Sequence, residues 1–320
     1  MIVAAHSLFL TETAVSVAQS GIRVVLRDRT VILLAAMFFA MVLISAYLGW
    51  SATETVNAIY AKAIPALQAQ GLAVPPNPVG DMPALSLFRN MVTYVALLGA
   101  LAALVLGHQT VAADRKSGVI PLLFSRPVSR SGIAAGKIAT LASLIATILL
   151  AAALINALTM LILPGLSITG AVWLGLMKFY GLSGLYMLAF GLLGAFCATY
   201  FNTESMSLLV PVTAWLALTF ILPQVTANIG PMAALNPVSA NLVPPSSAFF
   251  SATSALLGPL SIAEAYRCLA ASVLEIASGA GTATTAGGAL ASLVIANLAL
   301  AAAFIVQVNR LDASRSDYRD

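Results

Sequence analysis

The sequence contains very little charge for its length. Of its 320 residues, 8% are Asp, Glu, Lys or Arg, whereas a soluble domain carries about 25% charged residues. Hydrophobic residues make up 60% of the chain, which is more apolar surface than a soluble fold could cover. The composition therefore excludes a soluble domain and predicts an integral membrane protein, since several uncharged runs are long enough to span a bilayer.

Residue types that commonly carry catalysis or bind metals are also scarce. The chain has two histidines, His6 and His108, and two cysteines, Cys197 and Cys268, which lie too far apart in the expected topology to pair. We expect His108 to be an interfacial, hydrogen-bonded side chain. No carboxylate falls near the middle of an apolar run, which argues against proton or sodium coupling. We therefore expect no catalytic, cofactor-binding or metal-binding residue, and no nucleic-acid partner.

What the sequence does contain is long apolar runs. A membrane-spanning helix needs about 20 apolar residues, because its backbone polar groups must be satisfied inside the hydrocarbon. The prediction is an all-α membrane protein, with a single transmembrane domain over residues 1–320. Its six spans are expected at residues 31–50, 90–113, 138–163, 179–203, 205–225 and 286–309.

The distribution of Lys and Arg predicts the orientation of these spans. With six spans, the termini and the even-numbered loops lie on one side, and they hold eleven of the fifteen Lys and Arg residues. The other side holds four. Because cytoplasmic loops are enriched in Lys and Arg, we expect a multi-pass protein of the cell's inner (plasma) membrane with both termini in the cytoplasm.

Three segments outside the spans have patterns of their own. Residues 8–29 are expected to form an amphipathic helix that lies in the membrane interface. The outer segment 51–88 contains the Pro-rich run VPPNPVGDMP, which is typical of an irregular surface connection. The outer segment 227–285 has apolar residues at helical spacing from Ile262 to Ile276, which predicts a short amphipathic helix. Part of this last segment is a candidate for re-entry into the membrane.

Residues 114–137, DRKSGVIPLLFSRPVSRSGIAAGK, hold five of the fifteen Lys and Arg residues. Orientation in the membrane explains the charge, but it does not explain the glycine and prolines among the basic residues. The run GIAAGKI resembles a phosphate-binding P-loop only superficially, because three residues rather than four separate Gly132 from Gly136, and Ile138 follows the lysine. Nucleotide binding by this chain is therefore excluded.

The fourth predicted span contains a lysine and several glycines. Lys178 lies near the outer end of that span, where its long side chain can reach the interface. Gly184 and Gly191 belong to the run GLSGLYMLAFGLLGAF, and small residues let helices approach closely. We interpret Lys178, Gly184 and Gly191 as candidates for either helix packing or a transport pathway.

The stretch 114–137 resembles the ABC-2 type permeases, a family that includes the nitrous-oxide-reductase maturation permease. The similarity lies in an acidic residue (Asp114), a glycine (Gly118), the run LLFSRPVSR over residues 122–130, and Gly136-Lys137 before the third span. The family usually has Glu where this chain has Asp114. Over the rest of the chain, the resemblance consists of six spans, an N-terminal interfacial helix, a large last outer loop and cytoplasmic termini.

The resemblance implies a permease dimer that binds two cytoplasmic ATPase subunits, which hold the ATP and Mg²⁺. It also implies that the loop between spans 2 and 3 forms a coupling helix seated on the ATPase. The coupling residues would be Asp114, Arg115, Lys116, Gly118, Ser125, Arg126, Pro127 and Arg130. The basic side chains could pair with acidic groups on the partner, Pro127 could start a helix, and Gly118 would allow a backbone turn.

These observations lead to one principal hypothesis and two alternatives. The principal hypothesis is the transmembrane subunit of an ATP-driven transporter, with export favoured by the resemblance. One alternative is an ATP-independent channel or secondary transporter. The other is a membrane scaffold that docks a periplasmic assembly factor on its outer segments.

Overall fold

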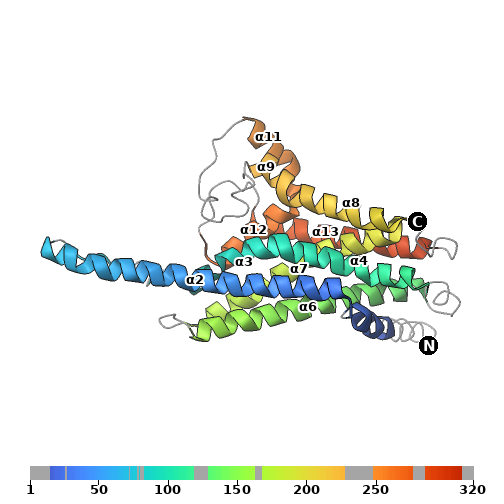
Figure 1. Ribbon diagram of the computed structural model, residues 1–320. Helices are drawn as coiled ribbons and strands as arrows, with labels where there is room; N and C mark the ends of the chain where they lie inside the picture. The colour runs from blue at the N-terminus through green and yellow to red at the C-terminus, as the bar shows by residue number, and fades with distance from the viewer. Residues whose placement is uncertain are drawn as a thin grey trace, which may run out of the picture.

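The computed structural model describes residues 15–25, 27–71, 73–77, 79, 83–118, 129–162, 168–227, 248–276 and 285–311. Within these ranges the chain forms helices and turns and contains no strand, which confirms the predicted all-α fold. The long helices lie alongside one another in an elongated bundle (Figure 1).

Six helical segments of the described chain are long and apolar enough to cross a membrane. Four are single helices: α2 (Arg29–Ala69), α6 (Arg130–Ile162), α7 (Gly170–Tyr200) and α13 (Ala286–Arg310). The second segment joins η1 (Ala84–Phe88), α3 (Arg89–Tyr94), η2 (Val95–Gly99) and α4 (Ala100–Lys116). The fifth joins α8 (Glu204–Leu216), η3 (Ala217–Ile221) and α9 (Leu222–Ala227). The six predicted spans are thus confirmed, although several helices are longer than the apolar runs that identified them.

Helix α2 is the clearest of these differences. Its predicted span ends at residue 50, but the helix continues without a break to Ala69, 41 residues in all. Such a helix is about 60 Å long, twice the hydrocarbon thickness of about 30 Å. The outer half projects beyond the other helices of the bundle (Figure 1). Outer segment 51–88 therefore begins as a helix, and the irregular backbone expected there is found at residues 73–77.

A shorter helix over residues 15–25 precedes α2 and lies at an angle to it (Figure 1). Asp28 caps α2, since its Oδ1 accepts the backbone N–H of Thr30 at 2.8 Å. On the shorter helix, Gly21 is buried against Thr140 of α6. Of the predicted interfacial helix over 8–29, residues 15–25 are therefore helical, and the place of this helix at a membrane interface stays a prediction.

Helix α7 is the centre of the bundle and contacts α4, α6, α8, α12 (Ile262–Val273) and α13. The backbones of α4 and α7 come very close, because glycines meet where the two helices cross. A Cβ at Gly107 would overlap the backbone of Gly191, and a Cβ at Gly194 would overlap the carbonyl of Leu104. Gly191 and Gly194 of the fourth span therefore pack inside this subunit, as small residues commonly do between membrane helices.

After the fifth span come α11 (Ala248–Leu257), which packs on α9, η5 (Gly258–Leu260), and α12, which packs on α7 and α13. Tyr266 of α12 stacks on Tyr186 of α7, with ring centroids 4.4 Å apart, and its hydroxyl lies 2.9 Å from the Ser183 hydroxyl. The predicted amphipathic helix is thus present, although it ends at Val273 as a regular helix. Because residues 228–247 and 277–284 lie outside the described ranges, re-entry of the 227–285 segment stays a prediction.

Candidate functional site

The two ends of the 114–137 stretch are joined by an ion pair. The Nζ of Lys137, on α6, lies 2.6 Å from the Oδ2 of Asp114, on α4. The same Nζ donates a hydrogen bond to the carbonyl of Thr110. Lys137 is 7% exposed, and a buried cation is tolerated only when it is paired and hydrogen-bonded. The pair therefore ties α4 to α6, where sequence reasoning placed Lys137 just ahead of the third span.

Arg115 is fully buried and serves this subunit rather than a partner. Its Nη1 donates to the carbonyls of Ala198 at 2.7 Å and Phe201 at 2.6 Å, at the C-terminal end of α7. The carbonyls at a helix C-terminus have no intrahelical partners and carry a partial negative charge. A guanidinium can donate hydrogen bonds to these carbonyls and its positive charge is attracted to them. With 1% of its surface exposed, Arg115 forms an internal cap on α7. The expected contact between Arg115 and an ATPase stays a prediction.

Lys116 remains accessible although it also has an internal partner. Its Nζ lies 2.5 Å from the Oε1 of Glu204, in the first turn of α8, and both side chains are about half exposed. An acidic residue in the first turn of a helix is itself favourable. An exposed pair of this kind contributes at most about 1 kcal/mol. Lys116 can therefore exchange its partner at little cost.

Arg130 links the start of α6 to the end of α13. Its Nη1 donates to the carbonyl of Asn309, in the last turn of α13, at 2.7 Å. Ser129 caps the N-terminus of α6, because its Oγ accepts the backbone N–H of Gly132 at 3.1 Å. The predicted coupling residue Arg130 is thus exposed and at the same time fixed to a neighbouring span.

Gly118 ends α4 with a left-handed backbone conformation. Its φ is +63°, and a Cβ at this position would meet no other atom within 4 Å. The glycine is therefore required by the backbone turn, as in helix C-terminal motifs, and not by a close approach of another residue. Ser125, Arg126 and Pro127 lie outside the described residues, so a helix starting at Pro127 stays a prediction.

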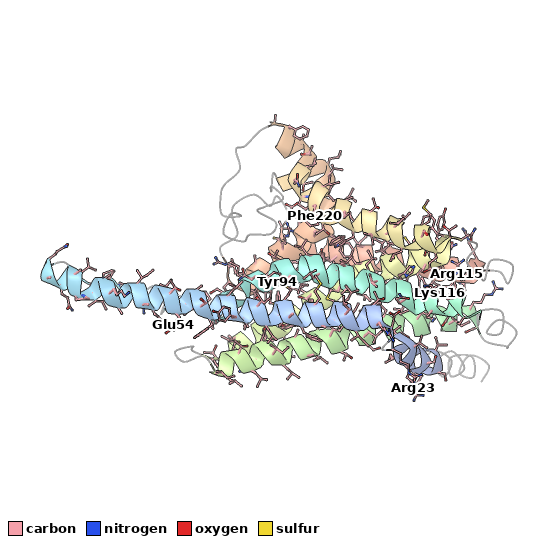
Figure 2. The ribbon with its side chains drawn as sticks, viewed as in Figure 1. Arg23, Glu54, Tyr94, Arg115, Lys116 and Phe220 are labelled. Carbon is pink, nitrogen blue, oxygen red and sulfur yellow. The ribbon has the colours of Figure 1, made fainter. Side chains whose placement is uncertain are left out.

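These contacts place the charged side chains at one end of the bundle. Arg115 and Lys116 lie at the same end as Arg23, and Glu54 lies on the projecting part of α2 at the opposite end (Figure 2). Through its two ends, the 114–137 stretch is attached to α4, α6, α7, α8 and α13. A force applied to this stretch would therefore reach five helices directly.

His108 lies on α4 about two helical turns inside this charged end. It is buried, and its Nε2 lies 2.9 Å from the Oγ of Ser207 on α8, while Nδ1 has no partner. The predicted hydrogen bond is present, but the side chain lies between helices instead of at an interface. In the described residues no three His, Cys, Asp or Glu side chains are grouped so that they could hold a metal ion.

The three candidate residues of the fourth span separate into different roles. Gly191 lies at the α4–α7 crossing, where a Cβ would lie 2.8 Å from Cδ2 of Leu141 and 3.1 Å from the Ala103 carbonyl. Gly184 instead lines a groove between α6 and α7, and Lys178 is exposed on α7. The role of Gly107 was not predicted from the sequence, because no glycine lies three or four residues from it.

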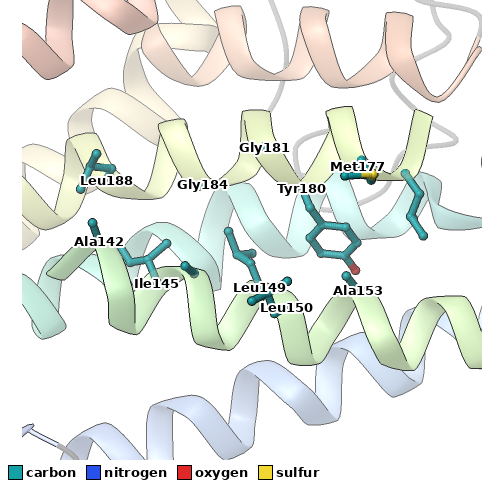
Figure 3. A pocket seen from close by; sticks show the side chains of 12 residues that line it. Ala142, Ile145, Leu149, Leu150, Ala153, Met177, Tyr180, Gly181, Gly184 and Leu188 are labelled. Carbon is teal, nitrogen blue, oxygen red and sulfur yellow. The ribbon is translucent and has the colours of Figure 1, made fainter. Parts of the chain in front are cut away.

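The groove between α6 and α7 has a volume of about 470 Å³ (Figure 3). Six residues from each helix line it, over positions 142–153 of α6 and 176–188 of α7. All are apolar except Tyr180, whose hydroxyl accepts a hydrogen bond from Nδ2 of Asn156 at 2.8 Å. The groove is therefore suited to bind a hydrocarbon chain, and the Tyr180 hydroxyl is the one polar group among its lining side chains.

A buried acidic group lies at the outer end of the molecule, on α12. Glu264 accepts a hydrogen bond from the hydroxyl of Thr226 at 2.9 Å, and Arg267 follows one turn later. Burial raises the pKa of Glu264 above its ordinary value, and the Thr226 hydrogen bond and Arg267 oppose this shift. Burial also lowers the pKa of Arg267. The sequence analysis did not identify this pair, because an amphipathic pattern places charged residues on the exposed face.

The family assignment agrees with this architecture. No curated protein matches the chain. A family model described as ABC-2 family transporter protein matches residues 15–311, which includes every helix described above. The match is to the family as a whole, and likeness to the nitrous-oxide-reductase maturation permease stays a prediction. The chain is therefore a multi-pass membrane permease that belongs to the ABC-2 family of transporter proteins.

Proposed function

We propose that this chain is the permease subunit of an ATP-driven exporter in the inner membrane, with both termini in the cytoplasm. In this proposal two copies form a homodimer and bind two cytoplasmic ATPase subunits. ATP and Mg²⁺ bind to the ATPases, and the permease moves its substrate by alternating exposure to the two sides. The chain itself catalyses no reaction.

The observation that carries this proposal is the attachment of the 114–137 stretch to the bundle at both ends. The Asp114–Lys137 ion pair holds α4 and α6 together at 2.6 Å. Arg115 and Arg130 extend this link to the ends of α7 and α13. Because these partners are backbone carbonyls, the link does not depend on flexible side chains at both ends. Movement of an ATPase against the loop would thus shift several spans together.

The residues left for the ATPase are those that remain accessible. Lys116 and Arg130 are exposed, and Arg126 lies in the middle of the loop. Three basic groups suit an acidic groove on a partner, because charge complementarity orients an interface and excludes wrong partners. Because Arg115 is buried, this proposal does not rely on it for the contact with the ATPase.

The test is charge reversal at Arg126 in the complete complex with the ATPase. Arg126→Glu is expected to weaken ATPase binding by about ten-fold or more, since it places a like charge against an acidic surface. Substrate-stimulated ATP hydrolysis in proteoliposomes should fall with it. Arg23→Glu is the matched control, because Arg23 is exposed at the same end of the bundle but outside the loop. Full binding and stimulation in Arg126→Glu would contradict the coupling role.

A second candidate function is the docking of a periplasmic protein, favoured by the projecting half of α2. Residues 73–77 are joined to this helix by two hydrogen bonds, with the Tyr60 hydroxyl donating to the Pro75 carbonyl at 2.6 Å and Asn77 donating to Asn57 at 2.9 Å. Ile59 on the projection is 63% exposed. Such an apolar side chain outside the hydrocarbon suits a protein partner.

Ile59→Asp separates this candidate from the transport proposal. If the projection docks a partner, the variant should lose binding to that periplasmic protein and keep substrate-stimulated ATP hydrolysis. Lys62→Gln, on the same exposed projection, is the control and should keep both. Loss of ATP hydrolysis in Ile59→Asp would instead assign the projection to transport itself.

A further inference from the structure

The groove between α6 and α7 exists because α7 has glycines where it would otherwise fill the space. A Cβ at Gly181 would meet no other atom within 4 Å, and one at Gly184 would reach only Leu149, at 3.4 Å. Leu150 and Met177 on its rim are 66% and 73% exposed, so the groove opens to the surface of the bundle. It is an open, apolar channel along two membrane-spanning helices (Figure 3).

The length of the groove is close to the thickness of one leaflet of the membrane. Its α6 side runs from Ala142 to Ala153, a rise of about 16 Å, which matches the half-thickness of the hydrocarbon, about 15 Å. Ala142 lies about 18 Å from Arg130 along α6. On α7, the lining positions 176–188 lie mostly in the half of the helix away from its charged end at Ala198, which is the outer-leaflet half if that end is cytoplasmic.

Polar groups occur only toward the outer end of the groove. Lys178 is exposed and directly follows Met177, on the same side of α7 as Gly181, three residues further on. The Tyr180 hydroxyl accepts the amide of Asn156, which leaves its own hydrogen available to an acceptor. Asn156 is completely buried and its Oδ1 has no partner. An apolar channel that ends at a hydroxyl donor and a cation matches a molecule with an acyl chain, an ester and an anionic head.

We propose that this groove is a binding site for one anionic phospholipid of the outer leaflet. One acyl chain lies along the glycine face of α7, an ester carbonyl accepts the Tyr180 hydroxyl hydrogen, and the phosphate pairs with Lys178. A second copy of the chain would fit this face less well, because it would remove Lys178 from lipid and water without supplying a countercharge. The inference concerns this chain alone and does not depend on coupling to an ATPase.

The test uses the full chain in lipid nanodiscs of phosphatidylglycerol and phosphatidylcholine. Phosphatidylglycerol with a photoactivatable group on its acyl chain is expected to label peptides of α6 and α7 over positions 142–153 and 176–188. Gly181→Leu places an apolar side chain in the channel, at a position where a Cβ meets no other atom within 4 Å, and should reduce this labelling at least five-fold. Gly287→Leu, a glycine-to-leucine change with equally open surroundings on α13, should leave the labelling unchanged.

Lys178→Gln tests the head-group contact separately. The ratio of bound phosphatidylglycerol to bound phosphatidylcholine, measured by native mass spectrometry, should fall by about five-fold. This is the effect expected of one basic residue at a membrane surface. Lys62→Gln, on the projecting half of α2, should not change it. Equal labelling of all exposed helices, or undiminished labelling in Gly181→Leu, would refute the site. Cysteine cross-linking between two copies through position 150 would show that a second copy occupies the groove and would also overturn the proposal.

Discussion

Replacing Lys137 by methionine removes the positive charge that joins α4 and α6 and keeps a side chain of similar length. The change leaves the carboxylate of Asp114 without its partner and the Thr110 carbonyl without a donor. If this ion pair transmits movement of the loop, both stability and coupling should respond. Lys137→Met therefore tests the structural premise of the proposed mechanism.

The magnitude follows from the burial of the two partners. Removing one member of a fully buried pair costs about 3–5 kcal/mol, whereas an exposed pair contributes about 1 kcal/mol or less. The Lys137 side chain is 8% exposed and that of Asp114 is 28% exposed, so water reaches the carboxylate in part. We expect Lys137→Met to cost about 2 kcal/mol, between these limits. Asp114→Asn should cost slightly more, because it leaves the more buried charge unpaired.

A double-mutant cycle measures the interaction directly. Unfolding of the wild type, both single variants and the double variant is followed in detergent, with ATP hydrolysis of the reconstituted complex as the second measurement. The double variant contains neither unpaired charge, and its destabilisation should be smaller than the sum of the single effects by 1 kcal/mol or more, on the order expected for residues in contact. Both single variants should also reduce substrate-stimulated ATP hydrolysis while ATPase binding persists.

Additivity of the two substitutions to within about 0.5 kcal/mol would refute the reasoning, because it would mean that Lys137 and Asp114 do not interact energetically. Normal coupling in variants that have lost the interaction would refute its mechanical role while leaving the ion pair intact as a structural feature.

Three further perturbations test other parts of the structure. Gly107→Ala should lower the free energy of unfolding by several kcal/mol, in the range of an overpacked core, because α4 must move away from α7. The control is Gly287→Ala, whose added Cβ meets nothing within 4 Å. This variant should leave the thermal midpoint unchanged or raise it. Arg115→Met should lower the free energy of unfolding by at least about 2 kcal/mol, because two carbonyls at the C-terminal end of α7 lose a charged donor. Lys116→Met should lower it by less than about 1 kcal/mol. Equal effects of the two substitutions would contradict the capping role of Arg115. Burial raises the pKa of Glu264 above 4.5, so the folded protein holds this proton more tightly than the unfolded chain does. The resulting contribution to stability is present at low pH and is lost as pH rises through the raised pKa. Glu264→Gln should therefore weaken the dependence of the thermal midpoint on pH above 4.5, and an unchanged dependence would show that this carboxyl does not titrate there.

Much of the architecture could be predicted from the sequence, because the membrane makes local composition decisive. A charge-free run of about 20 residues has few options besides a spanning helix, and six such runs are six long helices in the structure. The short helix with Ile262 and Tyr266 was likewise visible in the spacing of its apolar residues. The end of α2 was not, because residues 51–69 are less apolar but remain compatible with a helix that continues into water.

The contacts of the candidate site depend on the tertiary structure. Helices α6 and α7 are apolar on all sides, so the sequence carries no facial pattern that tells which side packs inside. The burial of Arg115 against the end of α7 and the meeting of Gly107 with Gly191 join residues more than 80 positions apart. The sequence by itself determined the number of spans, their chemistry and the position of the basic loop, since these follow from local solvation. Only the packed bundle decided which of the basic residues are buried between helices and which remain exposed.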